Sequence, residues 1–229
     1  MTAEPRLYLR QLEVGPMQNF VYLIGDREKR EAVVVDAAWD VDAILDVLDR
    51  DDMKLVGGLV THFHPDHLGG SMMGMQIEGA AELLGKRPVK IYMHKSEAPY
   101  AHRVAGLSDS DLVFTEAGDD LKVGDLTIKF LHTPGHTPGS QCFLVDGNLV
   151  SGDTLFIGSC GRVDLPGSSP EQLFYSLNHT LKALPPDTVL YPGHNYAAGR
   201  TTSTIGEETR RNPYMRFDRL QDFLSIMGY

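Results

Sequence analysis

The chain has 229 residues, of which 42% are hydrophobic, and a formal net charge of −10 at pH 7. This length and composition suffice for one sizeable core, so we predict a single domain over residues 1–229. The acidic balance gives no sign of a nucleic-acid partner, because a negative field repels phosphate backbones. No apolar run is long enough to span a bilayer, and residues 1–14 lack the basic and apolar regions of a secretion signal. We therefore expect a cytoplasmic protein without a membrane partner.

Apolar runs and turn residues alternate along the chain, a pattern that indicates mixed α and β structure. A helix is predicted at 41–50, where Ile44, Leu45 and Leu48 form one apolar stripe. Residues 72–84 are apolar at roughly helical spacing, and we expect their methionines to pack in the core or to line a pocket. The remaining predicted elements are strands at 7–14, 20–24, 32–37, 55–60, 89–93, 121–123, 126–131, 141–145, 148–151 and 189–191, a partly helical stretch at 94–112, helices that begin after Ser169 and Thr204, and a terminal helix at 220–227.

The strand at 55–60 is followed at once by the sequence THFHPDH at 61–67, with three histidines and an aspartate within six residues. Residues two apart in an extended segment point to the same side, so His62 and His64 can face one ion. Pro65 ends the regular strand, and Asp66 and His67 fall in a turn that aims them at a neighbouring position. Imidazole and carboxylate ligands suit zinc, iron or manganese, whereas calcium and magnesium prefer oxygen alone. The cluster therefore predicts a metal site.

Three further candidate ligands follow predicted strands. His136 lies in the turn Thr133–Gly139, Asp153 follows the strand at 148–151, and His194 follows the strand at 189–191. Each stands beside a glycine, which lets the backbone approach closely. Taken with the first cluster, these positions indicate that one site is assembled from several strand ends.

Together these residues resemble the metallo-β-lactamase superfamily, whose pattern is H-x-H-x-D-H followed by a distant His, an Asp and a last His. The resemblance covers nearly the whole chain and implies an α/β (α+β) fold, the four-layer αββα sandwich of two mixed sheets flanked by helices. It also implies two divalent metal ions, zinc in first place and iron or manganese otherwise, and catalytic roles for Asp66 and Asp153. The implied ligands are His62, His64 and His136 for one metal, Asp66, His67 and His194 for the second, and Asp153 as the bridge.

Two branches of the superfamily are similar to this chain. The strings at 133–139 and 152–156 are similar to glyoxalase II, so we predict a hydrolase of a thioester or related ester that uses a metal-activated hydroxide. Only 35 residues follow His194, too few for the C-terminal helical domain of that branch, and Arg162 and Asp164 are instead similar to the persulfide dioxygenases. A persulfide dioxygenase with one iron is the alternative, and a non-catalytic binding module is the second alternative.

The predicted substrate is a small-molecule thioester or a thiol-derived compound, and homo-oligomer formation is left open. Arg162 can bind a substrate carboxylate through its planar fork, or it can pair with Asp164 and brace the loop. Residues 71–115 form a longer stretch than in either branch, which we interpret as an insertion that caps the pocket or as a decorated surface loop. This stretch supplies Tyr100 and Arg103 as further candidate substrate contacts.

Overall fold

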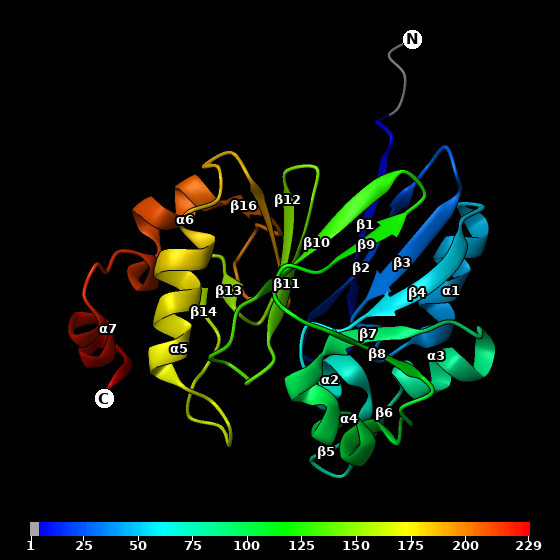
Figure 1. The fold of residues 1–229 in the computed structure, drawn as a ribbon, viewed down its shortest axis with the longest axis horizontal. Helices are drawn as coiled ribbons and strands as arrows, with labels where there is room; N and C mark the ends of the chain where they lie inside the picture. Colours follow the sequence, from blue (N-terminus) through cyan, green and yellow to red (C-terminus); the bar gives the residue numbers. More distant parts are fainter. Residues whose placement is uncertain (1–4) are drawn as a thin grey trace.

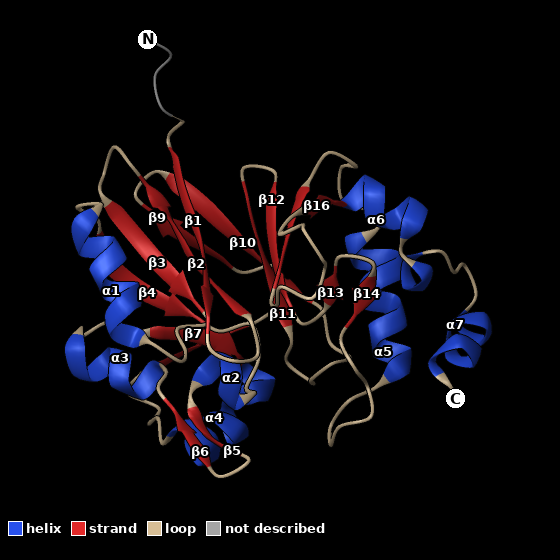
Figure 2. Cartoon of the chain, turned by 180° about the vertical axis from the view of Figure 1, so that it is seen from behind, coloured by secondary structure: helices blue, strands red, loops and turns tan. Residues whose placement is uncertain are grey.

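Two six-stranded sheets pack face to face in the computed structural model, which describes residues 5–229. Helices cover the outer face of each sheet, so that four layers lie in the order helix, sheet, sheet, helix (Figure 1). The same layers are seen from behind in Figure 2. The predicted αββα sandwich of two mixed sheets is confirmed. The first four residues of the predicted single domain lie outside the described residues.

The first sheet begins with an antiparallel meander and continues with parallel strands. Strands β1, β2 and β3 pair antiparallel, and β3, β4, β7 and β8 pair parallel. Its outer face packs on three helices, whose buried residues belong to one apolar cluster with the strands. The strands are β1 (Leu7–Val14), β2 (Asn19–Asp26), β3 (Glu31–Val35), β4 (Lys54–Leu59), β7 (Ile91–His94) and β8 (Leu112–Thr115), and the helices are α1 (Val41–Arg50), α3 (Ala80–Lys86) and α4 (Ala98–Ala105), the last preceded by the 3₁₀ turn η1 (Lys95–Glu97).

The second sheet has the strand order β16-β15-β12-β11-β10-β9 and is also mixed, because β12 and β15 pair parallel while its other pairs are antiparallel. The C-terminal helices cover its outer face. The strands are β9 (Asp120–Val123), β10 (Leu126–His132), β11 (Gln141–Val145), β12 (Asn148–Gly152), β15 (Val189–Pro192) and β16 (Ser203–Thr204), with the small hairpin of β13 (Leu155–Phe156) and β14 (Ser159–Cys160); the helical segments are α5 (Pro170–Tyr175), the π-helical η2 (Ser176–Leu181), α6 (Ile205–Arg211), the 3₁₀ turn η3 (Pro213–Met215) and α7 (Leu220–Met227).

Strand β2 shows how the layers are held together. All of its residues are buried, because one face packs on the second sheet and the other on the helices. Phe20 and Tyr22 enter the cluster between the sheets, where Phe130 and Phe143 meet edge to face at a centroid distance of 5.3 Å. The central layers are thus held by apolar packing, which leaves the strand ends free to carry polar groups. Among the described residues, no helix combines the length and apolar composition that crossing a bilayer requires.

The stretch 72–84 differs from its predicted helical form. It begins at the last residue of β5 (Gly70–Met72), which forms a hairpin with β6 (Met75–Ile77), and helix α3 begins only at Ala80. Gly74 has a φ of +80° in the hairpin turn, a conformation that ends a helix. Met73 and Met75 are 92% and 45% exposed and line no described pocket, so the prediction of core packing or pocket lining is wrong for these two methionines.

A buried carboxylate connects a turn of the first sheet to a turn of the second. Asp26, at the end of β2, accepts hydrogen bonds from the Arg6 guanidinium at 2.8 and 3.0 Å and from the backbone N–H of Asp125 at 2.9 Å. Burial alone would raise the pKa of Asp26, but these bonds and those from the backbone N–H groups of Lys29 and Glu28 lower it to about 2. The ionised carboxylate is therefore the form that joins the β2–β3 turn to the β9–β10 turn.

We expect Asp26→Asn to lower the midpoint of thermal unfolding by roughly 2–8 °C at pH 7, because the amide nitrogen would face donors. A depressed pKa contributes stability above the unfolded-state value near 4, and that stability is lost as the pH falls toward 2. Thermal melts between pH 2 and 7 should therefore converge for the two proteins at the acid end. A constant difference over the whole range would contradict this account.

Candidate metal centre

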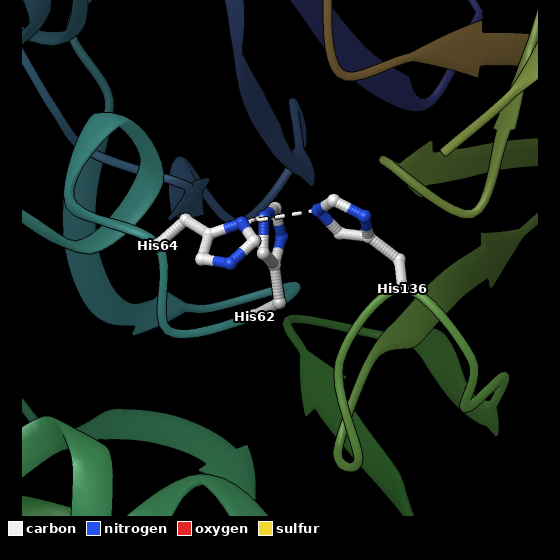
Figure 3. A group of neighbouring side chains, drawn as sticks. All are labelled: His62, His64 and His136. Carbon is white, nitrogen blue, oxygen red and sulfur yellow. Dashed lines mark hydrogen bonds between the residues drawn. The ribbon is translucent and has the colours of Figure 1, made fainter. Parts of the chain in front are cut away.

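The predicted ligands meet at one end of the two sheets, where several loops leave the strands. His62 follows β4, and His64, Asp66 and His67 lie at or within the short helix α2 (Pro65–Leu68), whose N-cap is His64. The others follow strands of the second sheet: His136 after β10, Asp153 after β12 and His194 after β15. Figure 3 shows the rings of His62 and His64, from one loop, turned toward the ring of His136, which comes from another loop. The structure thus brings all the predicted ligand residues together.

The first trio consists of His62, His64 and His136. The Nδ1 atom of His64 lies 3.1 Å from Nε2 of His62 and 3.0 Å from Nε2 of His136. The rings are nearly perpendicular to one another, so that their nitrogens converge rather than their faces. Burial lowers the pKa of His64 to about 4 and that of His62 well below its usual range. Neutral imidazoles with inward lone pairs are the form that binds a metal ion.

The second trio consists of Asp66, His67 and His194. Nε2 of His67 lies 3.2 Å from Nε2 of His194, and Oδ2 of Asp66 lies 3.3 and 3.4 Å from these two nitrogens. Burial lowers the pKa of both histidines, but Asp66 and Asp153 outweigh it and raise the pKa of His194 to about 9 and that of His67 well above its usual range. The carboxylates therefore stabilise positive charge at this position, which either protons or a metal ion can supply.

Asp153 lies between the trios. Its Oδ1 is 3.3 Å from Nε2 of His67, and its Oδ2 is 3.4 Å from Nε2 of His194 and 3.6 Å from Nε2 of His136. Oδ1 is buried, yet it makes no hydrogen bond within residues 5–229. A buried oxygen without a hydrogen bond needs an explanation, and a bound cation is one. The converging nitrogen and oxygen atoms of the two trios, together with this oxygen, fit a metal centre with two sites.

Partners behind the histidines hold each ring in one orientation. Nδ1–H of His136 donates to the carbonyl of Arg162 at 2.8 Å, and that of His194 donates to the carbonyl of Met17 at 2.9 Å. These bonds leave the Nε2 lone pairs directed inward, as in metal sites where an outer acceptor sets the tautomer.

Asp36 serves the same purpose for the histidines of THFHPDH. Its Oδ2 accepts from Nδ1 of His67 at 3.0 Å and from the Thr61 hydroxyl at 2.6 Å, and that hydroxyl accepts from Nδ1 of His62 at 2.9 Å. Sequence reasoning missed this residue. The available signal was a carboxylate directly after a buried strand, β3, that pairs parallel with β4.

Asn19 orients the carboxylate of the second trio. Its side-chain amide donates to Oδ2 of Asp66 at 3.0 Å, and its carbonyl accepts from Nε1 of Trp39 at 2.9 Å. Both residues are far from Asp66 in sequence, and no motif marks them. Their role follows from tertiary packing alone.

A cavity of about 470 Å³ opens onto the centre, and ligand residues of both trios line it. Its walls are largely apolar, with Met17, Met72, Phe156, Leu165 and Tyr196 among the lining residues. The position of Met72 confirms the pocket-lining prediction for that methionine. The apolar walls and the polar floor are typical of a small-molecule site.

The three predicted substrate contacts have different positions. Arg162 lines the cavity and also forms a two-point ion pair with the exposed Asp164, at 2.6 and 2.7 Å. Tyr100 stacks on Phe63 at a centroid distance of 4.0 Å, and the Arg103 guanidinium lies 5.2 Å from the Tyr100 ring. Within the described chain, neither Tyr100 nor Arg103 belongs to the cavity lining. Their part in substrate binding stays a prediction.

Comparison with known proteins establishes the family. The family model described as the Metallo-beta-lactamase superfamily matches residues 14–194, a span that contains both trios and Asp153. The chain therefore belongs to the metallo-beta-lactamase superfamily.

Its relatives include proteins named for different reactions. The Haemophilus influenzae protein named hydroxyacylglutathione hydrolase GloC is 32% identical, and the match covers 89% of this chain and 96% of that protein. The human protein named mitochondrial persulfide dioxygenase ETHE1 is 31% identical, over 97% of this chain and 81% of the human one. The crystal structure of ETHE1 from Myxococcus xanthus superposes with a TM-score of 0.81 at 31% identity, covering 96% of this chain and 90% of that one. The comparisons thus support a metal-binding superfamily member and leave its reaction to be inferred from the site.

Gly193→Ala should weaken metal binding by about 10–100-fold, which is the usual effect of a mutation that disturbs the orientation of a metal-ligating residue. A Cβ at this position would lie 2.4 Å from Oδ1 of Asp153 and 2.8 Å from the backbone carbon of Gly152, so the carboxylate would have to move. Gly85→Ala is the matched control, because a Cβ there meets nothing within 4 Å. Zinc affinity measured by chelator competition should fall only for the first variant; equal affinity in both would contradict the close approach.

Proposed function

We propose that this chain is a metal-dependent hydrolase that cleaves a thioester or related ester of a small molecule. The observation that carries the proposal is the pair of complete trios with Asp153 between them. Two metal ions bound there, with zinc as the leading candidate, would supply a hydroxide nucleophile near neutral pH and polarise the substrate carbonyl. No serine or cysteine nucleophile is then required.

The residues of the chain have distinct parts in this proposal. The first trio would hold one metal ion and the second trio the other, while Asp153 would span both. Asp66 and Asp153 are also the carboxylates among the described lining residues of the cavity, so they are the candidates to orient the attacking water. Asn19 keeps Asp66 in place through its 3.0 Å hydrogen bond.

The cavity indicates how a substrate would be bound. Apolar walls from Met72, Phe156 and Leu165 suit the carbon skeleton of an acyl group, and they exclude water from the reacting bond. Arg162 is the cationic lining residue, and its guanidinium can exchange Asp164 for a substrate carboxylate. We also propose a single-domain, cytoplasmic protein that acts on a soluble thioester, in line with the hydrolase name of the Haemophilus influenzae relative.

One observation favours the persulfide dioxygenase alternative. Arg162 and Asp164, the pair that suggested this branch, are hydrogen-bonded to each other, and Arg162 lines the cavity. The human relative named persulfide dioxygenase ETHE1 is 31% identical, and the ETHE1 structure from Myxococcus xanthus superposes with a TM-score of 0.81. One iron with three protein ligands would leave open positions for a persulfide and oxygen. The second trio would then have no catalytic metal to hold.

Protein purified without added metal can distinguish these reactions. Metal analysis should find two metal ions per chain, one for each trio. The protein should hydrolyse S-2-hydroxyacylglutathione thioesters at the same rate with and without oxygen. One iron per chain together with persulfide-dependent oxygen uptake would contradict the hydrolase proposal. Neither activity in fully metal-loaded protein would favour the non-catalytic binding module.

A further inference from the structure

Glu97 is a buried carboxylate that lies behind the first trio. It is 1% exposed and ends the 3₁₀ turn η1, directly before α4. Its Oε2 accepts a hydrogen bond from the backbone N–H of Phe63 at 2.7 Å. Its Oε1 accepts from the Thr137 hydroxyl at 3.0 Å and from the backbone N–H of Gly139 at 2.6 Å. One side chain therefore contacts two loops that are far apart in sequence.

These contacts are placed next to the histidines. Phe63 stands between His62 and His64, and Thr137 directly follows His136. The two oxygens of Glu97 thus hold the loop of one sheet at a set distance from the loop of the other. The distances within the first trio depend on this spacing, because its three histidines come from these same two loops.

The surroundings of Glu97 are shaped to admit the carboxylate. A Cβ on Gly139 would lie 2.5 Å from Cγ and 2.6 Å from Oε1 of Glu97, so a larger residue would push the side chain away. Tyr100, from the same segment as Glu97, stacks on the Phe63 ring. Within segment 71–115, Glu97 and Tyr100 therefore both contact the histidine loop at Phe63, and neither of them belongs to the cavity lining.

Burying a carboxylate is unfavourable, and an apolar side chain of similar size could fill the same space. Three hydrogen bonds, each from a backbone N–H or hydroxyl group of a ligand-bearing loop, offset part of this cost. The arrangement has the form of an outer partner that orients metal ligands without touching the metal.

We infer that Glu97 is a positioning residue that sets the geometry of the first trio by holding the loops of His62, His64 and His136 together. The inference rests on the ligand set of the proposed function and not on the reaction. It also assigns segment 71–115 a role in assembling the metal centre.

The test uses Zn²⁺ alone as the probe and separates the trios by two background variants. His194→Ala leaves the first trio intact, and His136→Ala leaves the second. Glu97→Gln keeps the size of the side chain but turns an amide nitrogen toward backbone donors. We expect it to weaken zinc binding by about 10-fold or more in the His194→Ala background and by less than about 2-fold in the His136→Ala background. Chelator competition on metal-free protein measures both affinities.

Two further changes keep the test decisive if Glu97→Gln impairs folding. Thr137→Val removes one donor without changing the shape of the side chain, and Gly139→Ala displaces the carboxylate; both should weaken the first trio selectively. The control is Glu116→Gln, which alters an exposed partner of Lys95, 2.7 Å away, and should leave both affinities unchanged. Unchanged zinc affinity, or an equal loss in the two backgrounds, would overturn the inference. Thioester hydrolysis is measured separately, so failure of the proposed function would leave this result interpretable.

Discussion

Asp153→Ala is expected to lower the zinc content of both trios and to reduce thioester hydrolysis by at least about 10³-fold. Asp153 is the carboxylate whose oxygens face both sets of histidines, at 3.3–3.6 Å. Its removal would take away the negative charge that offsets two neighbouring cations, as well as one ligand from each site. Metal analysis after dialysis and steady-state kinetics on the same sample measure the two effects.

His132→Ala is the matched control for this variant. His132 lies near His136 in sequence, but it stacks on His94 at a centroid distance of 3.8 Å, and its Nε2–H donates to the carbonyl of Pro138 at 3.0 Å. We expect its metal content to stay near that of the unchanged protein. Equal metal loss in the two variants would show that the ligand assignment is wrong.

Asp36→Asn should have the second-largest effect, on stability and metal binding together. Asp36 is 3% exposed and accepts from the backbone N–H and hydroxyl of Thr61, at 2.7 and 2.6 Å, as well as from His67 at 3.0 Å. An amide nitrogen would face at least one of these donors, which costs about 2–4 kcal/mol in unfolding free energy. Because His62 and His67 would lose their orientation, zinc affinity should also fall by about 10–100-fold.

The backbone does not confound this variant, since asparagine tolerates the positive φ of +56° found at Asp36. Urea unfolding of the metal-free protein gives the stability change, and chelator competition gives the affinity. Asp42→Asn, at an exposed partner of Lys86, is the control and should change stability by less than about 0.5 kcal/mol. Zinc affinity equal to that of the control would contradict the role given to Asp36.

Local signals predicted the regular elements well. Helix α1 begins and ends where the sequence places it, because Asp40 caps it by accepting from the N–H of Ala43 and its apolar stripe is buried. Strand β1 also has its predicted bounds, followed by Gly15 at a φ of +65°. The sequence did not predict the hairpin of β5 and β6, because the apolar residues of 72–84 have roughly helical spacing and the turn signal of Gly74 was given less weight. Turn geometry overrides periodicity in so short a segment.

The candidate site divides in the same way. The ligand residues follow a motif that can be read from sequence, and the structure brings them together, while their metal-binding roles stay a prediction. Asn19, Asp36 and Glu97 carry no such motif. Each acts on a residue 25 or more positions away, through contacts that exist only once the sheets have packed. Residue type alone does not distinguish them from ordinary buried polar groups.

The most direct test of the two-metal hydrolase is thioester hydrolysis during titration of the metal-free protein with Zn²⁺ in the absence of oxygen. Activity should rise until two ions are bound per chain. In the two-metal account, both trios must hold an ion, with Asp153 between them, to generate and direct the hydroxide. Activity that reaches its maximum at one ion, or that appears only with iron, a persulfide and oxygen, would contradict the account.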